Sequence, residues 1–461
     1  MLNLIKNEYI KLFKRGSIIG ATIVLFVFSF LILFVAKVGY SYIDEEVMYI
    51  GEDGEEVGLQ TERYYNVRIE SLKTDIKAIE DGTWKSGAET LKDLQRELEM
   101  FEFMLDNKIF GNEDWRRAVV AECFAKGYDS ESKEINDIKK CVEDNDFEAY
   151  VRLKAKLTKA EEITYTNCDE GIKNIYAYMV DKSIFDPTDW RYNALLELKN
   201  SAETVQDDSD VLQVKALNYR ILNNMQYATN DIPVSMFEEE ENDSTMFMKI
   251  FGSSASVMVI LCGVIIVIAG IIVATEHTTG TIKFLITNPV SRGKIIVSKY
   301  LTVVSLAAVG IFILFGFNML CSIILCGTEG IDASHLKVTV DGIKETSFVF
   351  NTFIEYCLEM VGVIAYGTMA FAISSIAKST SAAVATGIMS AMGGSLVSQL
   401  LAQMHQDWGR YLLFSNTSLS SIYKNGAYYP NQSVTFAITT VVIYVIIFFL
   451  IAYDGFTRRE V

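Results

Sequence analysis

The sequence has 461 residues, half of them hydrophobic, and a formal net charge of −17. Residues 44–243 hold about 47 acidic and about 24 basic side chains, so this segment carries roughly −23 and the remainder roughly +6. An acidic polar block between apolar segments predicts one water-exposed domain inserted into a membrane protein. This charge argues against nucleic-acid binding, because the polar block would repel phosphates.

Residues 1–16 have the pattern of an amphipathic helix. Their apolar side chains fall on one helical face, which contains Leu2, Ile5, Tyr9, Leu12 and Phe13. The pattern predicts a helix that lies in the cytoplasmic membrane surface and contacts lipid. A simple positively charged topogenic tail is the alternative interpretation.

Six runs are apolar over about 20 residues, the length at which a helix crosses the hydrocarbon core. They cover residues 17–41, 248–275, 300–326, 350–377, 381–403 and 434–453. The first is longer than a signal-peptide core and no small-x-small cleavage site follows it, so we expect an uncleaved anchor. Gly263 and Gly270 in the second run are expected points of close helix contact. The predicted fold is an all-α polytopic membrane protein.

Lysine and arginine in the short loops predict the orientation of these spans. They gather in residues 1–16, in the loop 276–299, at Lys378 and in the tail 454–461, which the positive-inside rule places in the cytoplasm. Both termini are therefore expected to be cytoplasmic, in a multi-pass protein of the bacterial plasma membrane. Residues 42–247 are expected to form an extracytoplasmic domain, and residues 327–349 and 404–433 outer loops, the latter with short helices.

The predicted outer domain, 42–247, has mainly helical periodicity. Its clearest apolar stripe steps by three and four through Leu91, Leu94, Leu98, Phe101 and Leu105. The domain contains no histidine, which argues against histidine-based catalysis and the common zinc sites. We therefore predict no catalytic or metal-binding residues there, and interpret the domain as a binding or gating cap.

The three cysteines of this domain allow one disulfide. Cys123, Cys141 and Cys168 lie in the polar block, and one pair of them could bond if the domain is extracytoplasmic. Sequence does not select the pair.

The loop at residues 276–299 reads EHTTGTIKFLITNPVSRGKIIVSK. Gly280 permits a turn as the chain leaves the membrane, and residues 281–287 follow as a short helix that Asn288-Pro289 ends. Ser291 is placed to cap the next helix. A short helix at the membrane surface suits contact with a partner protein, whose movement it would transmit to two spans.

The spacing E-x-x-x-G-T-I-K-x-L-x-T-x-P-V-S-R-x-x-I-x-x-S-K resembles the loop after the second span of ABC type-2 transporter permeases. The resemblance implies a six-span, type V exporter-like fold and a coupling helix that docks on a separate ATP-binding subunit. It assigns to this coupling role Glu276, Gly280, Thr281, Lys283, Pro289, Ser291 and Arg292. The large outer domain is similar to that of the sodium-exporter and peptide-antibiotic-immunity branches.

The same resemblance implies two kinds of protein partner. One is an ABC ATP-binding subunit, which would hold ATP and magnesium; the other is a second permease copy or a paralogue. The phosphate loop GxxxxGK[ST] is absent from this sequence, so no cofactor is expected in this chain and ATPase activity is expected in the partner. Lipid-anchoring of a basic loop is the alternative interpretation of residues 276–299.

Two carboxylates interrupt the fourth predicted span. Glu355 and Glu359 stand one helical turn apart, and carboxylates within a span point to a function such as cation binding, proton relay or contact with a cationic substrate. If the helix enters the membrane later than drawn, both lie near the interface instead. Asn318, Gln399 and Gln403 are expected to form interhelical hydrogen bonds.

The expected function is outward transport driven by ATP, as an exporter permease. A membrane sensor or receptor, whose outer domain binds a ligand and which transports nothing, is the alternative. A membrane-embedded hydrolase is disfavoured, because the chain has three histidines and no HExxH. A peptide antibiotic, a drug, a lipid-like molecule and an ion all remain open as substrates.

Overall fold

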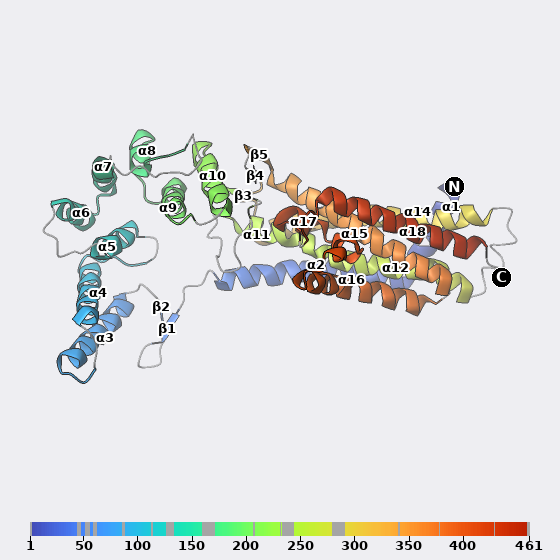
Figure 1. Cartoon of the computed structure of the whole chain (residues 1–461), viewed down its shortest axis with the longest axis horizontal. Helices are drawn as coiled ribbons and strands as arrows, with labels where there is room; N and C mark the ends of the chain where they lie inside the picture. Colours follow the sequence, from blue (N-terminus) through green and yellow to red (C-terminus); the bar gives the residue numbers. More distant parts are fainter. Residues whose placement is uncertain are drawn as a thin grey trace. The chain divides into compact units, whose positions relative to one another are not determined.

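The computed structural model divides the chain into two compact units (Figure 1). Residues Met1–Tyr40 and Tyr227–Val461 form the bundle unit, and Ser41–Gln226 form the inserted unit. The structure describes residues 2–43, 48–50, 56–58, 62–84, 88–111, 114–125, 133–158, 171–205, 208–230, 232, 244–278, 291–339, 342–377, 379–427 and 429–458.

The inserted unit is helical apart from a short hairpin, in which β1 (Met48–Ile50) pairs antiparallel with β2 (Glu56–Gly58). The predicted helical character is thus confirmed for its described residues. Its helices are α3 (Glu62–Glu80), α4 (Ala88–Asp106), α5 (Trp115–Ala125), α6 (Lys133–Glu143), α7 (Phe147–Leu157), α8 (Ile175–Asp181), α9 (Trp190–Glu203) and α10 (Asp208–Leu222).

Helix starts and aromatic packing organise this unit. Asp146, Asn174 and Asp189 cap α7, α8 and α9, each accepting a hydrogen bond from a backbone N–H of the first turn. The rings of Trp115 and Tyr150 lie 5.1 Å apart at the centre of its core. Local caps and a shared aromatic core therefore explain why an acidic segment folds compactly.

Six helical segments among the described residues are long and apolar enough to cross a membrane. They are formed by α2 (Gly16–Ile43), by the continuous α11 (Met246–Ser253), η2 (Ser254–Val257) and α12 (Met258–Thr278), by α14 (Arg292–Cys326), α15 (Phe348–Ala377), α16 (Thr380–Gln403) and α18 (Val434–Thr457). Each overlaps one predicted apolar run. The α14 helix starts before its run, because it continues through the polar residues that follow Ser291.

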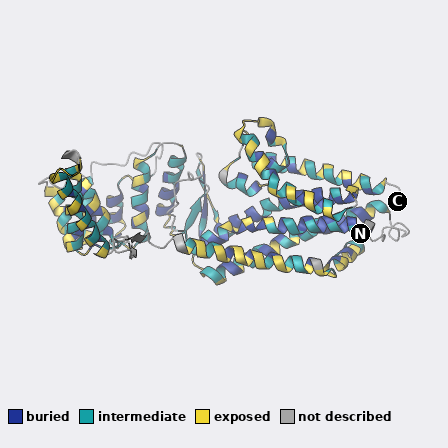
Figure 2. Ribbon diagram, turned by 90° about the horizontal axis from the view of Figure 1, so that it is seen from below, coloured by how far each residue is buried: buried dark blue, intermediate teal, exposed yellow. Residues whose placement is uncertain are grey.

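The segments run side by side, and both chain termini lie at the same end of the bundle, next to α1 (Leu2–Phe13) (Figure 1). We call this the α1 end. Buried residues concentrate between the helices and exposed residues follow their outward faces (Figure 2). The α12 and α15 segments are the most buried of the six and pack against each other, so they form the centre of the bundle unit.

Small residues let the central helices approach closely. A side chain at Gly270 of α12 would meet Val384 at 2.8 Å, and one at Gly387 of α16 would meet Ile266 at 2.5 Å. The predicted contact role of Gly270 is confirmed. For Gly263 the prediction is wrong within this chain, since no described residue lies within 4 Å of the position its side chain would take.

A small sheet lies at the opposite end of the bundle, which we call the sheet end. Its order is β3-β4-β5, where β3 (Ala228–Asn230) is parallel to β4 (Ser334–Thr339) and β5 (Gly342–Ser347) is antiparallel to β4. The predicted, mainly helical architecture is thus supplemented by this small sheet, and residues 327–349, which we predicted as an outer loop, contain β4 and β5. Because β3 pairs with β4, residues from Tyr227 belong to the bundle unit, whereas the predicted outer domain extended to residue 247.

The segment between α16 and α18 enters the bundle. It contains η3 (Asp407–Tyr411), η4 (Phe414–Asn416) and α17 (Leu419–Asn425). Its Thr417 carbonyl oxygen would lie 2.5 Å from a side-chain carbon added at Gly362, halfway along the 30-residue α15 and so about 21 Å from the start of that helix. Residues 404–433, which we predicted as an outer loop with short helices, therefore include a stretch that folds back between the helices, from η3 to α17, and we call it the re-entrant segment.

We expect Gly362→Ala to destabilise the protein. The added methyl group collides with backbone rather than with a flexible side chain, so the re-entrant segment has to move, at a cost of about 1–3 kcal/mol. The measurement is the thermal aggregation midpoint in mild detergent. Gly263→Ala is the matched control, because it has open space and alanine favours helix. Equal midpoints for the two variants would contradict the re-entrant packing.

Candidate functional site

A buried ammonium group marks the α1 end of the bundle. Lys299 of α14 has no exposed side-chain surface, and its Nζ lies 2.8 Å from Glu276 Oε1 and 2.9 Å from Glu8 Oε2. Its third contact is a hydrogen bond of 3.2 Å to the carbonyl oxygen of Ile272. Three donors of one ammonium thus bind acceptors on α1 and α12, which compensates the cost of burying the charge.

A second lysine completes this site, which we call the four-charge cluster: Glu8, Lys11, Glu276 and Lys299. Lys11 Nζ lies 3.3 Å from Glu8 and 3.5 Å from Glu276, with about half of its side chain exposed. The two carboxylates and two ammonium groups balance in charge. Because Lys11 is half-exposed, its pairs are weaker than those of Lys299.

Other contacts fix α1 against the same helices. The Tyr9 hydroxyl donates to Ser305 Oγ at 2.7 Å, and Arg15 donates to Thr275 Oγ1 at 3.2 Å. Leu12 is buried against the bundle core. The predicted amphipathic helix is therefore present, and it packs on α14.

The cluster joins the two helix ends that border the predicted coupling loop. Glu276 is in the last turns of α12 and Lys299 in the first turns of α14, so their ion pair closes the base of the stretch 279–290. Within the part of the chain that the structure describes, Glu276 Oε2 has no hydrogen-bond partner. The cluster therefore has an unused acceptor at the base of this loop.

The predicted coupling residues fall in three groups. Glu276 is buried in the cluster. Ser291 takes the N-cap position of α14 without a side-chain cap hydrogen bond, and the half-buried Arg292 begins that helix. Gly280, Thr281, Lys283 and Pro289 lie outside the described residues.

Sequence reasoning missed Glu8, Lys11 and Lys299 as members of this site. A signal was present: Glu8 lies on the apolar face of α1, between Ile5 and Leu12, and Lys299 lies between Ile295 and Val303 at helical spacing. A charge within an apolar stripe requires a buried partner. Identifying the partner of each charge would still have required knowing which helices are in contact.

The carboxylates of the fourth span lie together on one face of α15 and contact α17. Glu355 is buried, and its Oε2 lies 2.8 Å from Lys424 Nζ. Glu359 accepts a hydrogen bond from the hydroxyl of Ser420. Both predicted substrate or ion residues thus contact polar side chains of the re-entrant segment.

A buried chain of hydroxyl and amide groups links several helices. Asn318 of α14 donates to the Tyr356 hydroxyl at 2.8 Å, which donates to Ser254 Oγ at 2.9 Å, while Ser29 of α2 donates to Asn318. The predicted interhelical role of Asn318 is confirmed. Gln403 is exposed at the end of α16.

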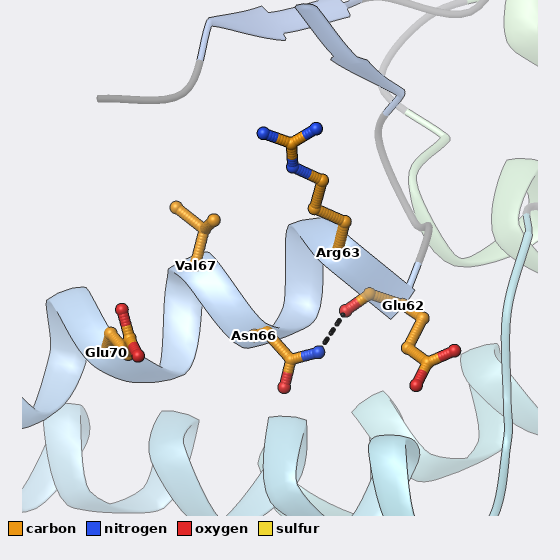
Figure 3. Close-up of a pocket in the computed structure, with 5 residues that line it drawn as sticks. All are labelled: Glu62, Arg63, Asn66, Val67 and Glu70. Atoms are coloured by element: carbon orange, nitrogen blue, oxygen red, sulfur yellow. Dashed lines mark hydrogen bonds between the residues drawn. The ribbon is translucent and has the colours of Figure 1, made fainter. Parts of the chain in front are cut away.

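In the inserted unit, a surface hollow and the possible metal ligands are relevant to binding. A hollow on α3 is lined by Glu62, Arg63, Asn66, Val67 and Glu70, all from one helix (Figure 3). The Asn66 amide donates to the Glu62 carbonyl of its own helix. Within the described ranges no group of three or more His, Cys, Asp or Glu residues is placed to hold a metal ion.

The structure reduces the number of possible disulfides among Cys123, Cys141 and Cys168. Cys141 carries a free thiol, which excludes the two disulfides that would involve it. Burial, followed by the nearby carboxylates of Asp146 and Asp137, raises the pKa of this thiol. Cys168 lies outside the described residues, so the pair Cys123–Cys168 stays open.

We expect Lys299→Met to destabilise the protein strongly, because it leaves the buried carboxylates of Glu8 and Glu276 with only the half-exposed Lys11 as a cation. Breaking a buried pair in this way costs about 3–5 kcal/mol. The thermal aggregation midpoint in detergent measures it, with Lys294→Met, an exposed lysine of the same helix, as the matched control. If Lys299→Met behaves like its control, the cluster does not hold these helices together.

Comparison with known proteins gives relatives of the bundle unit. The uncharacterized protein YhcI of Bacillus subtilis (strain 168) is 33% identical over 198 residues, which are 42% of this chain and 63% of the relative. The uncharacterized membrane protein YdbK of the same organism is 27% identical over 217 residues, 47% of this chain and 83% of the relative. The chain thus spans less than two thirds of the length of YhcI.

No solved structure matches the chain significantly. A family model described as "Protein of unknown function (DUF2705)" matches residues 214–461, which include most of the bundle unit and more than half of the chain. The chain therefore belongs to the DUF2705 family.

Proposed function

We propose that this chain is the permease subunit of an ATP-driven ABC exporter in the cell membrane, with both termini cytoplasmic. The six helices of the described ranges that are long and apolar enough to span a bilayer support a multi-pass protein, as does the likeness to a relative described as a membrane protein. The distribution of lysine and arginine supports the orientation. A type V exporter-like arrangement is part of the same proposal.

The observation that carries the proposal is the four-charge cluster. It ties Glu276 and Lys299, at the two ends of the loop, to each other and to Glu8 of α1. A force applied to residues 279–290 therefore acts on α1, α12 and α14 together, because separating them would leave a charge buried and unpaired. A device that receives movement from a soluble partner needs such a rigid base.

The partner in this proposal is a separate ATP-binding subunit, which supplies ATP and magnesium. The motif that begins at Glu276 and ends at Lys299 resembles the coupling loop of ABC type-2 permeases, and the chain lacks the GxxxxGK[ST] phosphate loop. Gly280, Thr281, Lys283, Pro289, Ser291 and Arg292 would form or flank the docking surface.

A second permease copy or a paralogue would pack against α16. This helix is the least apolar of the six, yet few of its residues are buried: Ala383, Gly387, Gly394 and Ser398. Its exposed surface mixes Met389, Met392 and Leu396 with small and polar residues. Small and polar side chains favour helix contact over lipid, whereas α18, equally exposed, is almost uniformly apolar.

We expect an ATPase to co-purify with the tagged protein from mild-detergent extracts of its native membrane. The double variant Gly280→Pro and Arg292→Glu should reduce magnesium-dependent ATP hydrolysis in the eluate by about tenfold or more, since losing a docking anchor costs about 1.4 kcal/mol or more. Lys344→Glu, which makes the same charge change at the sheet end, is the control and should retain the activity.

The outcomes separate the two function classes. Activity that is lost only from the loop variant supports the exporter and its coupling loop. If well-folded protein brings down no ATPase, the exporter is abandoned in favour of a membrane sensor.

We also expect a cysteine at Met392 to crosslink to a second permease chain when membranes are oxidised. A cysteine at Ile446, on the outward face of α18, is the matched control, because both residues are more than half exposed. Gel mobility of the crosslinked species measures the result and shows whether the second chain is identical. Crosslinking at Ile446 but not at Met392 would place the partner on α18 instead.

A further inference from the structure

Helix α17 covers the two buried carboxylates of α15. Its Lys424 pairs with Glu355, and its Ser420 donates to Glu359, one helical turn further along. Its apolar side chains Leu419 and Ile422 are buried in a small cluster with Ala437 of α18. The helix therefore lies on α15 through polar contacts and a limited apolar surface.

The polar contacts extend to a third residue of α15. Tyr423 donates from its hydroxyl to Asn351 Oδ1 at 3.1 Å, and Asn351 donates in turn to Glu355 Oε1 at 3.2 Å. Glu355 is thus reached from α17 directly, through Lys424, and indirectly, through Tyr423. We call the contacts Lys424–Glu355, Ser420–Glu359 and Tyr423–Asn351 the latch.

The latch also contacts the sheet. The ammonium group of Lys337, on β4, lies 4.1 Å from the centre of the Tyr423 ring, a distance at which a cation is attracted by the aromatic face. Tyr423 therefore contacts Asn351 through its hydroxyl and Lys337 of β4 through its ring. A shift of β4 would alter the position of Tyr423 and, through Asn351, the surroundings of Glu355.

The strand β3, which pairs with β4, follows the inserted unit in the chain. Residues 228–230 of β3 pair with 334–336 of β4, and β3 starts at Ala228, two residues after the inserted unit ends at Gln226. His335 of β4 also contacts Thr229 of β3, with 2.9 Å between His335 Nδ1 and Thr229 Oγ1. A displacement of β3 is thus transmitted to β4.

Two features of α17 favour its release from α15. It has only seven residues, so it is marginal as an isolated helix, and more than a third of its Lys424 side chain is exposed. Elements with few buried apolar contacts open at low free energy. The neighbouring Thr417, by contrast, is held against Gly362 and bonds the Tyr366 hydroxyl at 3.0 Å.

We propose that α17 is a lid over Glu355 and Glu359, and that the position of β4 controls its release through the contact of Lys337 with Tyr423. The proposal goes beyond the exporter function and does not depend on it, because a sensor with the same connection would use it too. In either case a displacement of β4 acts on the lid through one aromatic side chain.

The experiment measures how often α17 leaves α15. A cysteine replaces Ile422, which is 7% exposed. Full-length protein in lipid nanodiscs reacts with a maleimide, and peptide mass spectrometry reads the rate at residue 422, so the seven native cysteines stay in place. Glu355→Gln and Lys424→Ala should each raise the rate roughly five- to tenfold, because the charged pair no longer opposes opening.

A separate variant tests the contact between Lys337 of β4 and Tyr423. Lys337→Ala should raise the rate roughly two- to fivefold, whereas Lys344→Ala, which removes a lysine directly opposite on β5, should leave it unchanged. The exchanged pair Glu355→Lys with Lys424→Glu should return the slow rate, which distinguishes release from misfolding. The proposal is overturned if Glu355→Gln, Lys424→Ala or Lys337→Ala reacts at the parent rate.

Discussion

The bundle unit depends on the pairing of one buried ammonium group, that of Lys299. A fully buried charge is tolerated only with compensating partners, and here the partners come from α1 and from α12. The N-terminal helix therefore cannot act as an independent basic tail, because its Glu8 completes the coordination of a lysine 291 positions further along the chain. One electrostatic requirement thus fixes three helices around the base of a single loop.

Buried polar groups without a charge also need hydrogen-bond partners, and these partners connect other helices of the bundle. Between helices that face lipid on the outside, hydrophobic burial gives little discrimination, so small residues and interhelical hydrogen bonds set the register. The chain from Ser29 through Asn318 and Tyr356 to Ser254 does this near the sheet end. Close approach at Gly270 and Gly387 does it nearer the α1 end. Glu355 extends the principle to a charge, with Lys424 as its partner.

The sequence predicts well what depends on local pattern. Helix length and apolar content are local, and all six spans overlap predicted runs. The re-entrant segment could not be found in this way, because residues 404–433 read as a polar loop and their polar groups are satisfied by distant helices, as Thr417 is by Tyr366. The sheet was missed for the same reason, since β3 is only three residues long and its partner lies about a hundred positions away. Glu276 was predicted from its motif, whereas Glu8 and Lys299 required tertiary contacts.

The two polar sites stand at opposite ends of the most buried pair of helices, and this limits how they can communicate. Ser374 of α15 donates to the Gly270 carbonyl of α12 and accepts from the Ala274 N–H, so sliding one helix along the other breaks two buried hydrogen bonds. A joint tilt of α12 and α15 breaks neither. Movement at the four-charge cluster, which holds α12 through Glu276, would then reach Glu355 on α15 as a rigid-body rotation. In such a rotation α17 has to follow α15 or separate from it, and the latch contacts decide which occurs.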